Sequence, residues 1–112
     1  MIDEQPPVPV VTPREALRLT AEEGAVIVDV REAEELARTG RLAGALHMPL
    51  GMLPERAGQL PRDRPILIYC AAGIRSAVAA RALAAMGWPS VYNLGGFAEA
   101  AAEGIPVEAA DA

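Results

Sequence analysis

The sequence contains one cysteine, one histidine and no lysine. The single cysteine, Cys70, cannot form an internal disulfide, and the single histidine, His47, cannot by itself complete an ordinary zinc site. Without lysine there is neither a Schiff-base amine nor a P-loop lysine. These absences exclude a disulfide scaffold, a structural zinc domain and two classes of lysine-dependent chemistry.

Long apolar runs and excess positive charge are also missing. No apolar run approaches the ~18 residues of a membrane span, and residues 1–5 lack the basic start and apolar stretch of a signal peptide. The net charge of −5 provides no general attraction to nucleic acid or anionic lipid. We therefore expect a cytoplasmic location, where a lone thiol stays reduced, and neither nucleic acid nor a membrane as partner.

What the sequence does contain is enough apolar surface for one core. The chain has 112 residues, of which 52% are hydrophobic and 22% are charged. This size and composition predict one compact domain over residues 1–112, with its core at about 8–104 and flexible termini. Residues 1–7, which include the Pro6-Pro7 pair, are expected to form a frayed start.

Strand-like and helix-like segments alternate along the chain. Unbroken apolar runs at 25–30 and 65–70 are typical of strands that are covered on both faces. The alternation predicts an α/β fold with a mainly parallel sheet and helices on both of its faces. Such sheets bind ligands at the carboxyl ends of their strands, at the point where strand order reverses. Shorter strands are expected at 8–11, 45–48 and 90–94, and helices after Thr12 and at 31–39, 52–60, 76–86 and 97–103.

Two helices and one turn can be predicted in more detail. Thr12 and Glu15 form the pattern of a capping box, and Leu17 is expected to anchor that short helix in the core. The helix at 76–86 is almost entirely small and apolar, so we expect it to be mostly buried. Gly95-Gly96 is expected to form a turn before the last helix.

The segment at residues 70–76 joins a predicted buried strand directly to a predicted helix. A tight loop there directs backbone N–H groups and the positive end of the helix dipole to its centre, and Gly73 permits a left-handed backbone. We expect the Arg75 side chain to point at the occupant of the loop. Together these groups favour a nucleophilic thiolate at Cys70. The alternative, a small buried cysteine with a packing role, does not require this pattern.

This loop resembles the C-x-x-G-x-R-S active-site loop of the rhodanese family of sulfurtransferases. Three further segments resemble that family in order and spacing: 28–32 its D-x-R strand end, 40–49 its G-H-I-P-G-A-x-x-x-P stretch, and 91–97 its L-x-G-G-F-like segment. The resemblance spans roughly residues 8–104. It implies a single rhodanese domain with a mainly parallel, five-stranded sheet flanked by helices.

The resemblance also implies that Cys70 takes sulfane sulfur from a donor such as thiosulfate and becomes a persulfide. The sulfur then passes to cyanide or a thiol by a ping-pong mechanism, with no metal or organic cofactor. The implied partners are a small sulfur-containing anion or thiol, or a protein that accepts the sulfur. The loop that binds substrate and stabilises the persulfide would consist of Ala71, Ala72, Gly73, Ile74, Arg75 and Ser76.

Only one side chain of the loop is charged, because Ala71, Ala72 and Ile74 are apolar. We therefore expect weak capture of doubly charged thiosulfate and better use of an apolar or protein-bound donor. Outside the loop, three residues differ from the family's usual histidine, proline and tryptophan, and we interpret them as packing changes. They are Arg41, Ala43 and Ala100.

Asp29 ends the predicted strand beside this loop and Arg31 follows it, so both are expected to support the site structurally. In the simplest form of that role, Asp29 accepts hydrogen bonds from nearby backbone N–H groups and Arg31 pairs with Glu35, four residues on. His47 is expected to be a hydrogen-bonded structural histidine.

Two other functions stay open on the sequence alone. A cysteine-dependent phosphatase also uses cysteine and arginine around an anion cradle, but phosphatases of this kind place five residues between the two, and this loop has four. A non-catalytic binding or regulatory module is the second alternative, since many rhodanese-like domains have lost the cysteine. Because Cys70 is present, we favour the sulfurtransferase.

Overall fold

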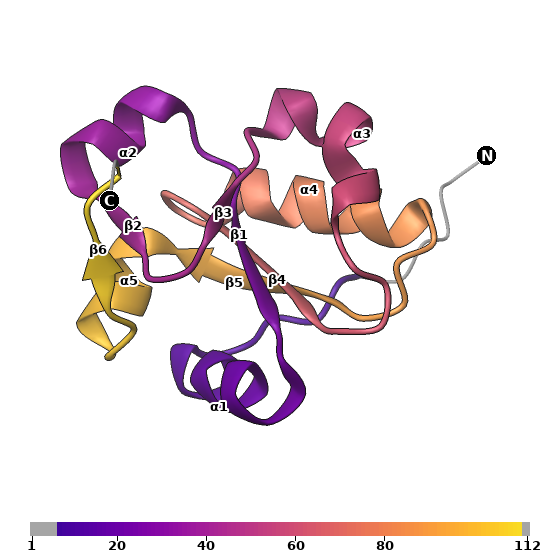
Figure 1. Ribbon diagram of the computed structural model, residues 1–112, viewed down its shortest axis with the longest axis horizontal. Helices are drawn as coiled ribbons and strands as arrows, with labels where there is room; N and C mark the ends of the chain where they lie inside the picture. Colours follow the sequence, from indigo (N-terminus) through magenta and orange to yellow (C-terminus); the bar gives the residue numbers. More distant parts are fainter. Residues whose placement is uncertain (1–6, 111–112) are drawn as a thin grey trace.

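The centre of the molecule is a four-stranded parallel sheet in the order β3-β1-β4-β5 (Figure 1). The computed structural model describes residues 7–110, so the frayed start predicted for residues 1–7 lies, apart from Pro7, outside the described residues. The predicted α/β fold is confirmed. The strands are β1 (Val26–Asp29), β3 (Leu46–His47), β4 (Ile66–Cys70) and β5 (Val91–Gly96).

The expected fifth strand at 8–11 is reduced to a single bridge between Val10 and Asn93 of β5. Asn93 N donates to Pro9 O at 2.9 Å, and Val11 N donates to Asn93 O at 3.0 Å. Proline has no N–H with which to extend a ladder, and Pro9 lies in the middle of this segment. The prediction of five strands is therefore corrected to four strands and a bridge.

Helices cover both faces of this sheet. They are α1 (Pro13–Glu23), α2 (Ala33–Thr39), α3 (Leu53–Arg56), α4 (Ile74–Ala85) and α5 (Phe97–Ala102), with short 3-10 turns η1 (Leu50–Met52) and η2 (Ala57–Gln59) on either side of α3. Figure 1 shows α1 on one face and α3 and α4 on the other. Along β4, Ile66, Ile68 and Cys70 face α3 and α4, and Leu67 and Tyr69 face the opposite core.

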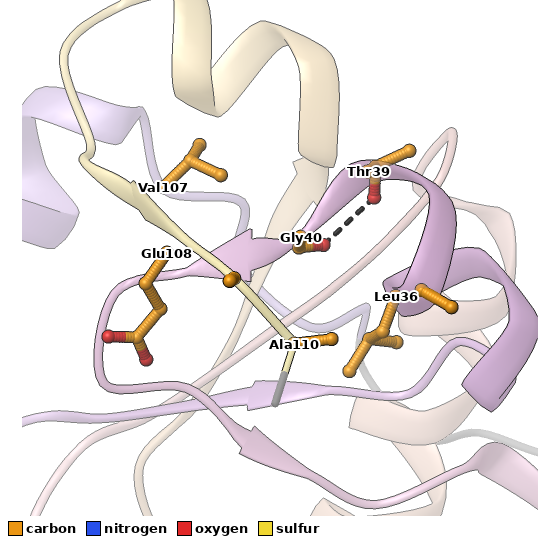
Figure 2. Close-up of a pocket in the computed structure, with 8 residues that line it drawn as sticks. Leu36, Thr39, Gly40, Val107, Glu108 and Ala110 are labelled. Atoms are coloured by element: carbon orange, nitrogen blue, oxygen red, sulfur yellow. Dashed lines mark hydrogen bonds between the residues drawn. The ribbon is translucent and has the colours of Figure 1, made fainter. Parts of the chain in front are cut away.

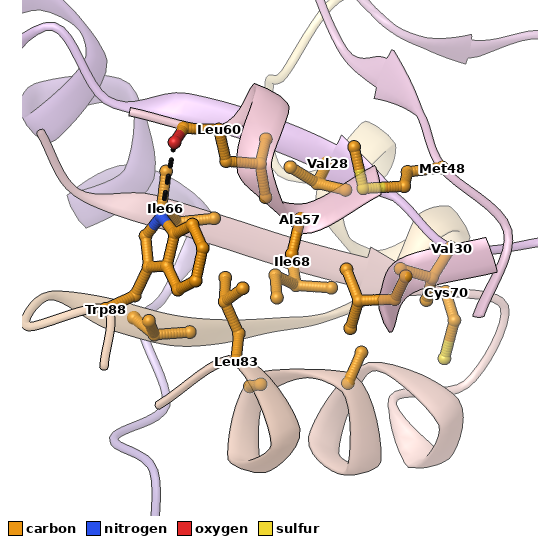
Figure 3. Packing of buried hydrophobic residues seen from close by; sticks show 14 residues of the cluster. Val28, Val30, Met48, Ala57, Leu60, Ile66, Ile68, Cys70, Leu83 and Trp88 are labelled. Atoms are coloured by element: carbon orange, nitrogen blue, oxygen red, sulfur yellow. Dashed lines mark hydrogen bonds between the residues drawn. The ribbon is translucent and has the colours of Figure 1, made fainter. Parts of the chain in front are cut away.

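The strand order reverses between β1 and β4. From β1 the chain crosses to β3 on one side, and from β4 it crosses to β5 on the other. Loops that leave two strands in opposite directions open a crevice at their carboxyl ends, which is where such sheets bind ligands. β1 ends at Asp29 and β4 ends at Cys70, which lies beside Val30 at one end of the core in Figure 3.

Two predictions about helix burial are wrong. Leu17 is 40% exposed, and α1 is anchored by Ala16 and Leu19 instead. The helix predicted at 76–86 begins two residues earlier and buries one face rather than most of its surface, because a helix that covers a sheet presents its outer side to solvent. The buried residues of α4 are Ser76, Ala79, Ala80 and Leu83.

A small antiparallel sheet, which was not predicted from the sequence, lies outside the main sheet. It pairs β2 (Arg41–Leu42) with β6 (Val107–Glu108), and Arg41 Nε donates to Glu108 Oε1 at 3.2 Å. A hollow of about 440 Å³ lies between α2 and β6, and its lining residues are drawn in Figure 2. No helix within residues 7–110 is both long and apolar enough to cross a membrane.

The predicted capping box of α1 is present and can be tested by its effect on stability. Glu15 N donates to Thr12 Oγ1 at 3.1 Å, and Thr12 N donates to Glu15 Oε1 at 3.0 Å. Thr12→Ala is expected to lower the free energy of unfolding by about 1 kcal/mol in urea denaturation. Thr20→Ala, in the interior of the same helix, should change it by less than about 0.5 kcal/mol. Equal losses would contradict a capping role.

Candidate active site

Two backbone N–H groups and one hydroxyl group lie around the sulfur of Cys70. Gly73 N donates to Sγ at 3.0 Å, Ser76 N donates to it at 3.4 Å, and Ser76 Oγ lies 3.4 Å from it. Gly73 caps the start of α4 with φ 93°, the left-handed conformation that the sequence predicts. The sulfur lies at the positive end of a helix of 12 residues and is almost fully buried.

Two opposing effects act on the ionisation of Cys70. Burial disfavours the thiolate and raises the pKa of Cys70, whereas hydrogen bonds from the Ser76 hydroxyl and from the backbone N–H groups of the loop lower it. The lowering effects prevail together, so the pKa of the Cys70 thiol lies below its ordinary value. This favours the thiolate, the nucleophilic form of cysteine.

Arg75 does not point at the occupant of the loop, which corrects the sequence-based expectation. Its Nη1 and Nη2 each donate to Glu35 of α2 at 2.8 Å, a bidentate ion pair. The hydrogen bonds from Arg75 lower the pKa of Glu35 to about 2. Glu35 thus neutralises the one charged side chain of the loop, and the predicted pairing of Glu35 with Arg31 is wrong.

Asp29 and Arg31 form a buried ion pair with each other. Arg31 Nη2 donates to Asp29 Oδ2 at 2.8 Å, and the backbone N of Arg31 donates to Asp29 Oδ1 at 2.9 Å. The rest of the guanidinium is also engaged: it donates to Thr39 Oγ1 and Gly40 O and lies 4.4 Å from the centre of the Phe97 ring. With its polar groups used in this way, the pair braces the turn after β1 and the end of α2.

His47 lies in the structural environment that the sequence predicts. Its Nε2 is 2.7 Å from the carbonyl oxygen of Arg31, so one ring nitrogen is held by the backbone of the braced turn. No contact between His47 and the cysteine loop is present among the hydrogen bonds of residues 7–110.

β5 shapes the loop in a way that was not predicted from the sequence. Gly95 and Gly96, predicted as a turn, continue β5 and pair with Tyr69 and Cys70. A Cβ atom on Gly96 would lie 2.9 Å from the carbonyl oxygen of Ala71, closer than such contacts occur. Gly96 therefore keeps room for the loop. The polar Asn93 in an otherwise apolar strand was the signal that this strand does more than pack.

Asn93 connects three parts of the site. Ser76 Oγ donates to its Oδ1 at 2.8 Å, Gly95 N donates to the same oxygen at 2.9 Å, and its Nδ2 donates to the carbonyl of Gly73 at 3.2 Å. A hollow of about 230 Å³ adjoins the loop at Ala71 and is also lined by Phe97, Arg38 and four further residues.

Comparisons with known proteins identify the family of this chain. A family model described as the rhodanese-like domain matches residues 12–103. The chain belongs to the rhodanese-like domain family. A sulfurtransferase of Allochromatium vinosum is 38% identical to it over 93 residues, which cover 82% of this chain and 86% of the relative. The thiosulfate sulfurtransferase GlpE of Actinobacillus succinogenes is 35% identical over 101 residues, which cover 89% and 90% of the two chains.

A solved structure shows the same rhodanese-like fold. The reduced CoADR-RHD of Bacillus anthracis superposes with a TM-score of 0.73 at 35% identity, over 83% of this chain. This chain spans only 16% of that protein. The rhodanese resemblance of the sequence is thereby confirmed, together with its fold.

The ion pair between Arg75 and Glu35 predicts a specific pH dependence of stability. The folded-state pKa of Glu35 is about 2, below its ordinary value of 4.5. The pair therefore stabilises the folded state fully above pH 4.5, and this stabilisation is lost as the pH falls through about 2. Glu35→Gln should remove this part of the pH dependence in urea denaturation on either side of pH 4.5. The effect should be modest, because the Arg75 side chain is 35% exposed.

Glu34→Gln is the matched control for this experiment. Glu34 is an exposed carboxylate of the same helix and has no ion-pair partner among residues 7–110. Its replacement should leave the acid-induced loss of stability as it is in the unmodified protein. Identical pH dependence in the Glu34 and Glu35 variants would show that the pair contributes nothing.

Proposed function

We propose that this protein is a sulfurtransferase that carries sulfane sulfur as a persulfide on Cys70. The observation that supports this most directly is the convergence of two N–H donors, Gly73 N and Ser76 N, on Cys70 Sγ, with the Ser76 hydroxyl 3.4 Å from the same sulfur. Such preorganised donors stabilise negative charge on sulfur before and after the sulfur is transferred. The curated names of relatives over most of this chain support the same activity.

The reaction consists of two displacements at sulfur. The Cys70 thiolate attacks the outer sulfur of a donor such as thiosulfate, the S–S bond of the donor breaks, and sulfite leaves with the electron pair. Cys70 then holds a persulfide anion. A thiolate or cyanide attacks the terminal sulfur, takes it, and returns the Cys70 thiolate. Atoms and charge balance without a metal or organic cofactor, which is the pattern of ping-pong catalysis.

The environment of Arg75 supports a preference among sulfur donors. Since Arg75 is paired with Glu35, the loop offers a dianion its N–H groups and helix dipole but no free cation. Ile74, which is 76% exposed, adds an apolar surface at the same loop. We therefore favour an apolar or protein-bound donor over thiosulfate, and a small thiol or a protein as acceptor.

The alternatives are less well supported by the same contacts. A phosphatase needs its arginine side chain to bind the phosphate, whereas both terminal nitrogens of Arg75, Nη1 and Nη2, donate to Glu35. A purely binding module has no use for a thiol with a lowered pKa. We also propose that the chain acts in the cytoplasm, where the free thiol from which the reaction starts stays reduced. Residues 1–112 are proposed to act as one domain.

Intact-mass measurement after incubation with thiosulfate or a thiosulfonate tests the persulfide. We expect Cys70 to gain one sulfur atom, which cyanide or dithiothreitol removes, and we expect no gain in Cys70→Ser. The single cysteine makes the assignment unambiguous. If no sulfane donor produces the adduct, the binding-module alternative replaces the sulfurtransferase.

Steady-state kinetics with different donors test the preference. We expect the KM for thiosulfate to be about tenfold above that for an aryl thiosulfonate, equivalent to about 1.4 kcal/mol. Glu35→Gln weakens the hold on Arg75 and should lower the thiosulfate KM, whereas Glu34→Gln should not. A thiosulfate KM comparable to that of every thiosulfonate and protein persulfide tested would rule the preference out.

A further inference from the structure

Asn93 is placed to control the hydroxyl of Ser76. Its amide orientation is determined by two backbone contacts: Gly95 N must meet an oxygen, and the carbonyl of Gly73 must meet an NH₂ group. The amide oxygen therefore faces Ser76 Oγ at 2.8 Å. An amide oxygen carries no proton, so the Ser76 hydroxyl is the donor in this hydrogen bond.

A hydroxyl has only one proton, and this has a consequence for Cys70. While Ser76 donates to Asn93, it presents a lone pair to Sγ, 3.4 Å away. That arrangement suits the thiol, whose S–H can donate to Ser76 Oγ. It does not suit the thiolate, which has no proton and needs the hydroxyl to turn toward sulfur and leave Asn93.

We propose that Asn93 is a positioning residue that competes with the sulfur of Cys70 for the Ser76 hydroxyl proton. With Asn93 in place, the hydroxyl is held away from sulfur until negative charge develops there, and it then turns to the sulfur. Asn93 also holds the Gly73 carbonyl, and with it the loop that aims Gly73 N at sulfur. This inference deepens the proposed function: the role of Asn93 in sulfur transfer rests on Cys70 being the sulfur carrier.

The two actions of Asn93 have opposite effects on the thiolate, so a single substitution cannot separate them. A double-mutant cycle can, because only the competition depends on the Ser76 hydroxyl. The four proteins needed are the unmodified chain, Asn93→Leu, Ser76→Ala, and the double variant. The charged groups around the loop are unchanged throughout the cycle; they are Arg75, Glu35, Glu32, Glu99, Asp29, Arg31 and Arg38.

The readout is the pKa of Cys70, from thiolate absorbance as a function of pH. Each protein is measured against the same protein carrying Cys70→Ser, which subtracts the absorbance of the two tyrosines. We expect Asn93→Leu to shift the pKa downward by about one unit more when Ser76 is present than in the Ser76→Ala background. Tyr92→Phe, on the same strand, is the matched control and should leave the pKa unchanged.

Equal pKa shifts in the two backgrounds, or a coupling of opposite sign, would overturn the proposal and leave Asn93 a purely structural residue. If Asn93→Leu does not fold, Asn93→Asp takes its place. A carboxylate holds the hydroxyl more firmly, so the excess shift in the presence of Ser76 should then be upward. The titration requires no sulfur transfer. Coupling without a persulfide adduct would therefore refute the proposed function alone, and an adduct without coupling would refute the role of Asn93 alone.

Discussion

The 3.0 Å hydrogen bond from Gly73 N to Cys70 Sγ is the constraint around which the candidate site is built. To aim that N–H at sulfur, the loop must turn within three residues, which requires the left-handed backbone of Gly73. This turn also brings Gly73 and Ala71 against the end of β5. Gly96 makes this approach sterically possible, because a Cβ at this position would lie 2.9 Å from the Ala71 carbonyl oxygen, whereas Gly95 provides a left-handed backbone with φ 95°.

Two ion pairs surround the site, and they have different physical roles. The Asp29–Arg31 pair is buried, and its remaining donors are used by Thr39 and Gly40, so it holds the turn after β1 and the end of α2 in one shape. The Arg75–Glu35 pair is half-buried and joins α4 to α2. Its effect is electrostatic, because it removes a free cation from beside the sulfur. The cradle is left with N–H groups, one hydroxyl and a helix dipole.

A cradle of dipoles suits a sulfur carrier. A persulfide bears a single negative charge. It must be stable until an acceptor binds, and its outer sulfur must then be readily transferred. Hydrogen bonds to sulfur and the helix dipole provide stabilisation of that moderate kind. A cation in direct contact would hold a dianion more firmly, and here that cation is paired with Glu35. Competition between Asn93 and sulfur for the Ser76 proton is a further way to adjust the same balance.

The sequence by itself determined the features whose causes lie within a few neighbouring residues. The capping box at Thr12 and Glu15, the apolar run of β4 and the left-handed Gly73 all follow from local preferences and periodicity, and the order of strands and helices along the chain implied the crevice where Cys70 lies. Only the tertiary structure decided the partners of the side chains. Glu35 and Arg75 are 40 residues apart, and Ser76 and Asn93 are 17 apart. A charged or polar side chain has many sterically possible partners at such separations, and which one it meets depends on strand order, register and helix orientation, all of which arise only when the whole chain packs.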